Sequence, residues 1–236
     1  MTDDRGVSDT LSFVLVFALV ISGVGLVTVF GMSSLVDAKD GVNAQTAERG
    51  FVVLAEDIDE LERSQSPVRT SDIALTDASL AVTTGPTVEV SVGGSSFSET
   101  FALHALAYRT ESTVVSYAGG GVFRTQDGGT AVVSSPAVRC TPTAATVSLV
   151  RLTAEGSESV AGGAARVAVT HSETRLAFPE TRAPQTVTNV SVTTTDERWQ
   201  RALAAQPGWT ATGPDTHTCS TERVFVRETT VSVDLE

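Results

Sequence analysis

The residues that could do chemistry in this sequence are few and widely spaced. The histidines are His104, His171 and His217, and the cysteines are Cys140 and Cys219. In a strand over His217-Thr-Cys219, alternate side chains would place two metal ligands on one side, and Cys140 could supply a third. The chain lacks the paired Cys-x-x-Cys or His-Glu-x-x-His spacing that usually marks a zinc site. We therefore expect no metal, no cofactor and no catalytic residue.

Other catalytic patterns are missing as well. The sequence contains no Gly-x-Ser-x-Gly nucleophile elbow, no phosphate-binding loop and no dinucleotide fingerprint. The run Gly119 to Gly121 does not precede a helix with a lysine, so it predicts a hairpin turn rather than a phosphate cradle. Carboxylates are numerous but scattered, as on a solvated surface. These absences favour a protein that is not an enzyme.

The two cysteines leave two interpretations open. Cys140 and Cys219 could form one disulfide that closes a long loop, which would stabilise an extracellular domain by about 2 to 4 kcal/mol. They could equally remain as two buried thiols. The distance between the cysteines in space does not follow from one sequence, so both alternatives stand.

The amino-acid composition limits the classes of partner that the protein could bind. The 28 acidic residues outnumber the 16 basic ones, and the net charge of −12 disfavours nucleic acid and anionic lipid surfaces. Lys39 is the only lysine. An acidic, lysine-poor composition is typical of proteins that stay soluble at high salt, although mutational bias in a GC-rich genome would explain it equally well. We expect no nucleic-acid partner.

One long apolar segment near the N-terminus would anchor the rest of the chain. No charged residue occurs from Leu11 to Val36, which is longer than the roughly 20 residues that span a bilayer. We predict a transmembrane or filament-core helix over residues 7–36. Within it, Gly23, Gly25 and Gly31 would let neighbouring helices approach closely.

The residues before this segment resemble a known signal. Asp3-Asp-Arg-Gly6, followed by Val7-Ser8 and the apolar helix, resembles the class III signal peptide of archaeal type IV pilins, in particular those of haloarchaea. The resemblance implies that residues 1–6 form a leader and that a prepilin peptidase cleaves between Gly6 and Val7, leaving the helix on the mature protein. Asp9 could then pair with the charged amino terminus of a neighbouring subunit. Alternatively, Asp9 is a first-turn acid behind a Ser8 N-cap.

This resemblance implies a function. We expect a pilin-like subunit, minor or accessory because its outer domain is large, that is anchored and assembled through the N-terminal helix into a type IV pilus-like surface filament. Its partners would be the membrane, the prepilin peptidase and other pilin-like subunits, of the same or another kind. Most of the chain would lie outside the cell. The alternative is a membrane-tethered β-sandwich that never polymerises and binds a ligand or partner at the cell surface.

Helical periodicity continues beyond the apolar segment, over residues 37–63. Apolar residues recur there every three or four positions, on one helical face, and these residues are Ala44, Ala47, Phe51, Leu54, Ile58 and Leu61. The pattern predicts an amphipathic stalk helix. Its apolar face could pack on the chain's own outer domain or on other subunits as a short coiled coil.

The remainder, residues 70–236, predicts an extracellular β-rich domain. In Thr87 to Val92 valines alternate with polar residues, as in a half-buried strand. Similar segments are 73–82, 97–108, 112–117, 145–152, 165–171, 186–193 and 224–235. One helix, Arg198 to Ala205, follows a capping box in which Thr194 would be the N-cap. We therefore predict an α+β protein with a mainly antiparallel, sandwich-like domain.

The predicted outer domain contains one N-glycosylation sequon, Asn189-Val-Ser191. Extracellular placement would expose it to modification. Because it lies within a predicted strand, the side chain of Asn189 would have to point outward, and an unused sequon is the alternative.

Overall fold

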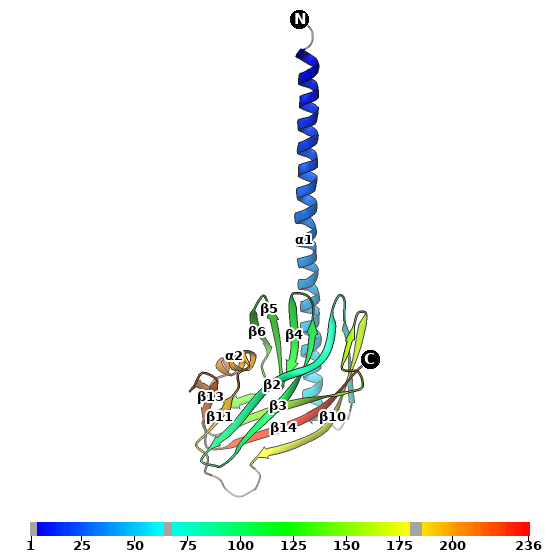
Figure 1. Ribbon diagram of the computed structural model, residues 1–236. Coiled ribbons are helices and arrows are strands. Elements are labelled where there is room, and N and C mark those ends of the chain that lie inside the picture. Colours follow the sequence, from blue (N-terminus) through cyan, green and yellow to red (C-terminus); the bar gives the residue numbers. More distant parts are fainter. Residues whose placement is uncertain (1–3, 64–67, 180–185) are drawn as a thin grey trace. The chain divides into compact units, whose positions relative to one another are not determined.

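The computed structural model describes the backbone of residues 4–63, 68–179 and 186–236 (Figure 1). Side chains are described for the same residues except 4–10, 29–38, 40, 62 and 63. The chain forms two compact units, Met1–Asn43 and Ala44–Glu236. Helix α1 (Asp4–Arg63) is assigned without interruption and contributes to both units, and helix α2 (Glu197–Ala205) belongs to the second.

Strands make up most of the second unit. Those within the described residues are β1 (Val68–Ala74), β2 (Ser79–Gly93), β3 (Ser98–Arg109), β4 (Thr113–Ala118), β5 (Gly121–Gln126), β6 (Gly129–Ser134), β7 (Val138–Cys140), β8 (Ala145–Glu155), β9 (Ser159–Ala161), β10 (Ala164–Phe178), β11 (Asn189–Thr193), β12 (Thr210–Ala211), β13 (Thr216–Ser220) and β14 (Val224–Leu235). Together with the helices, they give the predicted α+β fold class.

The strands form two sheets. The smaller has the order β1-β10-β14-β8-β7, and the larger has the order β12-β13-β11-β2-β3-β4-β5-β6, with β9 paired to β2. Among the described strands, the pairing of β14 with β8 is parallel and the other pairings are antiparallel. The predicted sandwich-like, mainly antiparallel arrangement is therefore confirmed. The parallel pair was not foreseen, because period-two alternation does not report the relative direction of paired strands.

Two apolar cores fill the space between these elements. One, which we call the α1 core, contains Phe51, Leu54 and Ile58 of α1 together with side chains from both sheets. The other, which we call the α2 core, contains Trp199 and Leu203 of α2 and again side chains from both sheets. Each helix thus covers strands from both sheets and helps to hold the two sheets together.

The buried face changes along two central strands. On β3, Leu103 and Ala105 face the α2 core, whereas Leu106 faces the α1 core. On β8 the change falls between Leu149 and Val150. Because successive side chains of a strand point to opposite sides, these strands are buried on both faces where the two cores meet. The same two sheets therefore contribute side chains to both cores.

Turn chemistry explains most of the strand ends. The Gly119 and Gly120 φ angles are +62° and +98°, so these residues form the tight turn between β4 and β5 and confirm the predicted hairpin. Asp77, with φ of 53°, lies between β1 and β2, so the expectation of one strand over 73–82 is wrong. β2 instead continues past Gly85 through a bulge between Thr84 and Thr87.

The beginning of α2 also differs in detail from the expectation. The N-cap is Asp196, whose carboxylate accepts hydrogen bonds from the backbone amides of Arg198 and Trp199. Thr194 Oγ1 accepts a hydrogen bond from the backbone amide of Asp196, 3.2 Å away, rather than capping the helix itself. A carboxylate at this position also interacts favourably with the positive end of the helix dipole. The predicted helix is correct, and its predicted cap is two residues too early.

Candidate functional site

The most unusual surface of the described chain is the apolar part of α1. Residues Leu11–Thr28 have a mean hydropathy of 2.5, and none of this stretch is buried. Its exposed side chains include Phe13, Phe17 and Leu19. Thr28, the polar residue at its end, donates a side-chain hydrogen bond to the Val24 carbonyl at 2.8 Å, so its hydroxyl is satisfied within the helix. The segment is long and apolar enough to cross a membrane.

Several residues predicted to act in this helix lie outside what the structure describes in side-chain detail. Gly6, Val7 and Asp9 fall within α1, but the surroundings of their side chains, and those of Gly31, are not described. Gly23 and Gly25 are described, and a Cβ added to either would meet no heavy atom within 4 Å. These two glycines therefore leave open backbone surface on the apolar helix, as close approach by another helix requires.

The last part of α1 is buried in the second unit. All six residues of the predicted apolar stripe, from Ala44 to Leu61, are at most 3% exposed. Polar contacts join the flanks of the helix to neighbouring strands: Glu48 accepts from Arg124 at 2.8 Å, and Asp57 accepts from Ser71 at 2.8 Å. Of the two alternatives for the stripe, packing on the chain's own β domain is the one observed.

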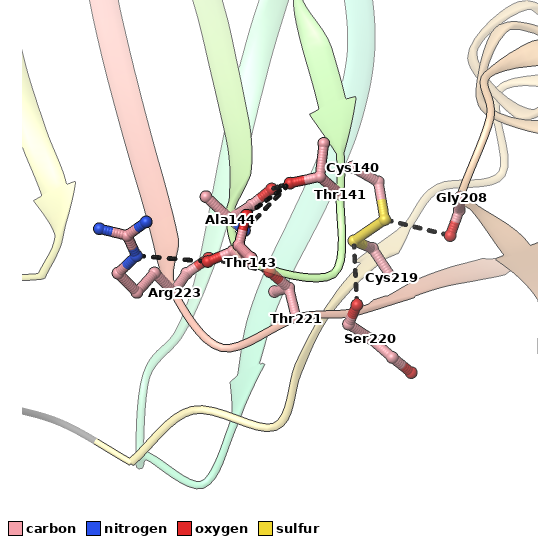
Figure 2. Close-up of a disulfide and its surroundings, with 9 residues drawn as sticks. All are labelled: Cys140, Thr141, Thr143, Ala144, Gly208, Cys219, Ser220, Thr221 and Arg223. Carbon is pink, nitrogen blue, oxygen red and sulfur yellow. Dashed lines mark hydrogen bonds between the residues drawn. A yellow bond between two sulfur atoms is a disulfide. The ribbon is translucent and has the colours of Figure 1, made fainter.

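The two cysteines meet at the α2 core. Cys140 ends β7 of the smaller sheet, Cys219 lies in β13 of the larger one, and the two form a disulfide that spans 79 residues (Figure 2). The bond therefore ties the two sheets to each other covalently. Cys140 Sγ also lies 3.1 Å from the Gly208 carbonyl oxygen. Because both sulfurs belong to the disulfide, neither is a free thiolate that could bind a metal.

An open depression of about 470 Å³ lies beside this disulfide. Apart from Cys140, Pro142 and Gly208, its lining residues carry hydroxyl groups, and these are Thr141, Thr210, Thr212, Thr218 and Ser220. Thr218 Oγ1 is 2.9 Å from both Ser191 Oγ and Thr212 Oγ1, so its hydroxyl is already engaged with neighbouring hydroxyls. The depression offers neither a charge nor an aromatic face to a ligand.

The histidines do not gather into a site. His217 is buried on the same side of β13 as Cys219, as the sequence predicts, but its neighbour is committed to the disulfide. His171 shares a 2.9 Å hydrogen bond with Thr174, and His104 is exposed on β3. Among the described residues no group of three histidine, cysteine or acidic side chains is arranged to hold a metal ion.

An ionic network around one buried carboxylate joins the two sheets and was not foreseen. Glu228 on β14 is 3% exposed and contacts Arg151 on β8 and Arg175 on β10, with 2.8 Å between its Oε2 and the Arg175 Nε. Arg175 also pairs with Glu99 on β3, in the other sheet. Sequence spacing gives no signal for this network, because its members come from four strands whose order is known only from the fold.

The surroundings of Arg175 favour its protonated form. Hydrogen bonding to Glu99 raises its pKa above the usual arginine range, burial opposes that rise, and Glu228 adds to it. When the pKa of a base is higher in the folded than in the unfolded chain, the shift stabilises the fold fully at any pH below the unfolded-state pKa. This stabilisation is lost only as the pH rises through the folded-state pKa. Since both lie in strongly alkaline solution, titration of Arg175 itself introduces no pH dependence near neutrality.

The sequence profile of one protein family matches residues 5–234, almost the whole chain. The chain belongs to DUF7289, a family of unknown function. No curated protein and no solved structure matches it significantly. Among the described residues of this DUF7289 member, no three histidine, cysteine or acidic side chains form a metal-binding group, and the hydroxyl-lined depression has no charged lining residue. The exposed apolar segment of α1 is the described surface that most clearly requires a lipid or protein partner.

Proposed function

We propose that this DUF7289 protein is a pilin-like subunit, minor or accessory, of a type IV pilus-like surface filament. The observation that carries the proposal is the contrast along α1. Residues 11–28 are apolar and exposed. By contrast, the six residues of the predicted apolar stripe, from Ala44 to Leu61, are buried in the β domain. A helix built in this way couples a surface that must be covered by lipid or by other helices to a folded extracellular domain.

The energetic cost of leaving the apolar segment in water supports this use. Each fully exposed leucine or phenylalanine side chain forgoes about 1.5 to 3 kcal/mol of burial free energy, and Leu11–Thr28 carries many such residues. A bilayer removes that cost, and so does a bundle of like helices. The segment would therefore be inserted in the membrane first, with the β domain outside.

Transfer from lipid into a filament then needs a different driving force. Lipid tails and apolar helices are similarly nonpolar, so association must come from close packing rather than from hydrophobic transfer. Gly23 and Gly25, whose surroundings are open in the monomer, are suited to such packing. The Arg5-Gly6-Val7 sequence, which resembles a class III cleavage site, adds the expectation that the helix is released from a short leader and starts at Val7.

Mass spectrometry of the mature amino terminus tests the first step. In protein isolated from the organism that encodes it, we expect a chain that begins at Val7, and Gly6→Leu should block this processing while Ser8→Ala, as a neighbouring control, should not. A mature chain that still begins at Met1 would contradict the pilin proposal.

Imaging tests the second step. Electron microscopy of cells carrying an epitope-tagged chain should show label along or at the end of surface filaments. A chain that is cleaved at Gly6 but labels only the membrane would instead support the tethered, non-polymerising binding module.

A further inference from the structure

The sequon Asn189-Val-Ser191 occupies the first three positions of strand β11. β11 starts at Asn189, which pairs with Gly93, the last residue of β2, on one side and with Ser220, the last residue of β13, on the other. Val190 and Val192 are fully buried in the α2 core. Because side chains alternate along a strand, Asn189 and Ser191 face away from that core. The acceptor asparagine thus lies at the end of a central strand, on the face of the sheet that points away from the α2 core.

The cross-strand neighbours of Asn189 are small, and the asparagine is partly exposed. Gly93 has no side chain, and a Cβ built there would lie 2.6 Å from Asn189 Oδ1 and 2.8 Å from Nδ2. The Asn189 amide therefore lies over the space that a larger residue would occupy. Ser220, on the other side, is small and exposed. Asn189 Nδ2 donates a long hydrogen bond, 3.4 Å, to the hydroxyl of the adjacent Thr188.

We propose that Asn189 is the attachment site of an N-linked glycan. The donor would be an oligosaccharide joined to a polyprenyl phosphate. Asn189 Nδ2 forms a bond to the anomeric carbon of the sugar while the bond from that carbon to the phosphate oxygen breaks. The phosphate leaves with the bonding electrons, and the amide nitrogen loses a proton to a base of the transferase. The inference rests on the extracellular location of the β domain that the proposed function includes.

The fold also fixes when the glycan is added. Transfer at a sequon depends on the hydroxyl two residues after the asparagine, and here Ser191 Oγ lies 2.9 Å from Thr218 Oγ1 in the folded domain. A transferase therefore reaches the Ser191 hydroxyl most readily before β11 pairs with β13. Thr218 follows Ser191 by 27 residues in the chain, so the sequon leaves the membrane before its partner strand does. Modification of the emerging chain satisfies both requirements.

The finished domain accommodates the product of this reaction. With Gly93 beneath the amide and Ser220 beside it, a sugar on Nδ2 extends over the outer face without displacing a residue of the α2 core. A glycan at the adjacent Val190 position would be incompatible with folding, because that side chain is fully buried. The register of β11 therefore agrees with the sequence motif.

Peptide mass spectrometry on full-length protein from the native organism tests the proposal. We expect the peptide that contains Asn189 to carry a series of sugar masses. Asn189→Gln and Ser191→Val should remove them, whereas Ser191→Thr should retain them because threonine also completes the sequon. Thr218→Val, which removes the folded-state partner of Ser191, should leave occupancy unchanged. Resistance to limited proteolysis, compared across the variants, shows that each one still folds.

Location is measured in parallel, so that two failures can be told apart. An antibody against an epitope tag at the C-terminus, added to intact cells, should label the β domain if it lies outside. A domain that is labelled in this way but carries a bare Asn189 overturns the glycan and leaves the proposed function intact. A domain that is labelled only after the cells are permeabilised, and is bare, overturns the glycan and the proposed location together.

Discussion

At the scale of single residues, the disulfide region shows how one glycine can be required by a partner far away in sequence. Gly208 has φ of +84°, in the left-handed region that other residues rarely adopt. A Cβ at this position would lie 2.7 Å from Cys140 Sγ and 3.1 Å from the Cys140 carbonyl oxygen. The residue therefore meets two demands at once, one from its own backbone and one from the disulfide that lies against it.

These two demands can be separated by a matched pair of variants. Gly128, in the turn between β5 and β6, has a similar φ of +75°, but a Cβ there would meet nothing within 4 Å. We expect Gly128→Ala to cost only the backbone term, about 1 to 2 kcal/mol. Gly208→Ala should cost about 2 to 4 kcal/mol, because the disulfide or the loop must also move. Denaturant unfolding of the detergent-solubilised chain, followed by tryptophan fluorescence, gives both values, and equal losses would rule out the disulfide contact as a constraint.

Some of these sites could be predicted from residue types alone, and others could not for a physical reason. The cysteine pair was predicted as one of two alternatives, and the sequon residues were identified directly from their motif. The Gly208 contact and the Glu228 network were not predicted. Arg151, Arg175 and Glu228 come together only because β8, β14 and β10 are neighbours in that order. Strand order is a long-range property, and alternation within one strand carries no information about it.

At the scale of elements, the end of α1 acts as a structural part of the β domain. Phe51 is fully buried in the α1 core, whereas Val53, two positions later on the same helix, is 50% exposed. Salt bridges from Glu48 and Glu60 to strand residues contribute less than this apolar packing, since exposed ion pairs are worth about 0.2 to 1 kcal/mol each. Burial of the helix stripe is therefore the main link between α1 and the sheets.

Truncating the two side chains should expose this difference. We expect Phe51→Ala to lower the free energy of unfolding by about 3 to 5 kcal/mol, because it leaves a cavity between the helix and both sheets. Val53→Ala, which also removes apolar atoms from α1, should change it by less than about 0.5 kcal/mol. The same tryptophan-monitored unfolding measures both, since Trp199 and Trp209 are buried in the α2 core. A small effect of Phe51→Ala would mean that the sheets are stable without the helix.

Periodicity predicted the elements better than it predicted their boundaries. The α1 stripe is regular and parts of β3 and β14 alternate clearly, so both helix and strands were recognised. β2 was divided wrongly between the segments 73–82 and 87–92, whereas the strand continues through Gly85 and Pro86 with a bulge. β5 and β6 were missed, although Asp127-Gly128 is a strong hairpin signal and both residues have positive φ. Short strands that are only half-buried produce weak alternation.

At the scale of the whole molecule, the chain combines two surfaces with opposite solvent requirements. The β domain is acidic and hydroxyl-rich and folds around its own cores, whereas residues 11–28 expose apolar side chains without a break. Supplying lipid or neighbouring helices to that segment does not require any change in the β domain. Membrane attachment and domain folding should therefore fail independently when each is mutated.

Charged substitutions in the apolar segment test this independence. Leu19→Lys together with Val20→Lys places two charges at the middle of Leu11–Thr28, and each should cost about 2.5 to 3.5 kcal/mol of insertion free energy. We expect the double variant to leave the carbonate-washed membrane fraction while its β domain stays folded and disulfide-bonded. The matched control is Val42→Lys with Val53→Lys, which adds the same charge to exposed positions of α1 outside that stretch and should remain membrane-bound. If the Leu19 and Val20 variant stays in the membrane as firmly as the control, the anchor does not lie in residues 11–28, and the apolar helix must serve another purpose.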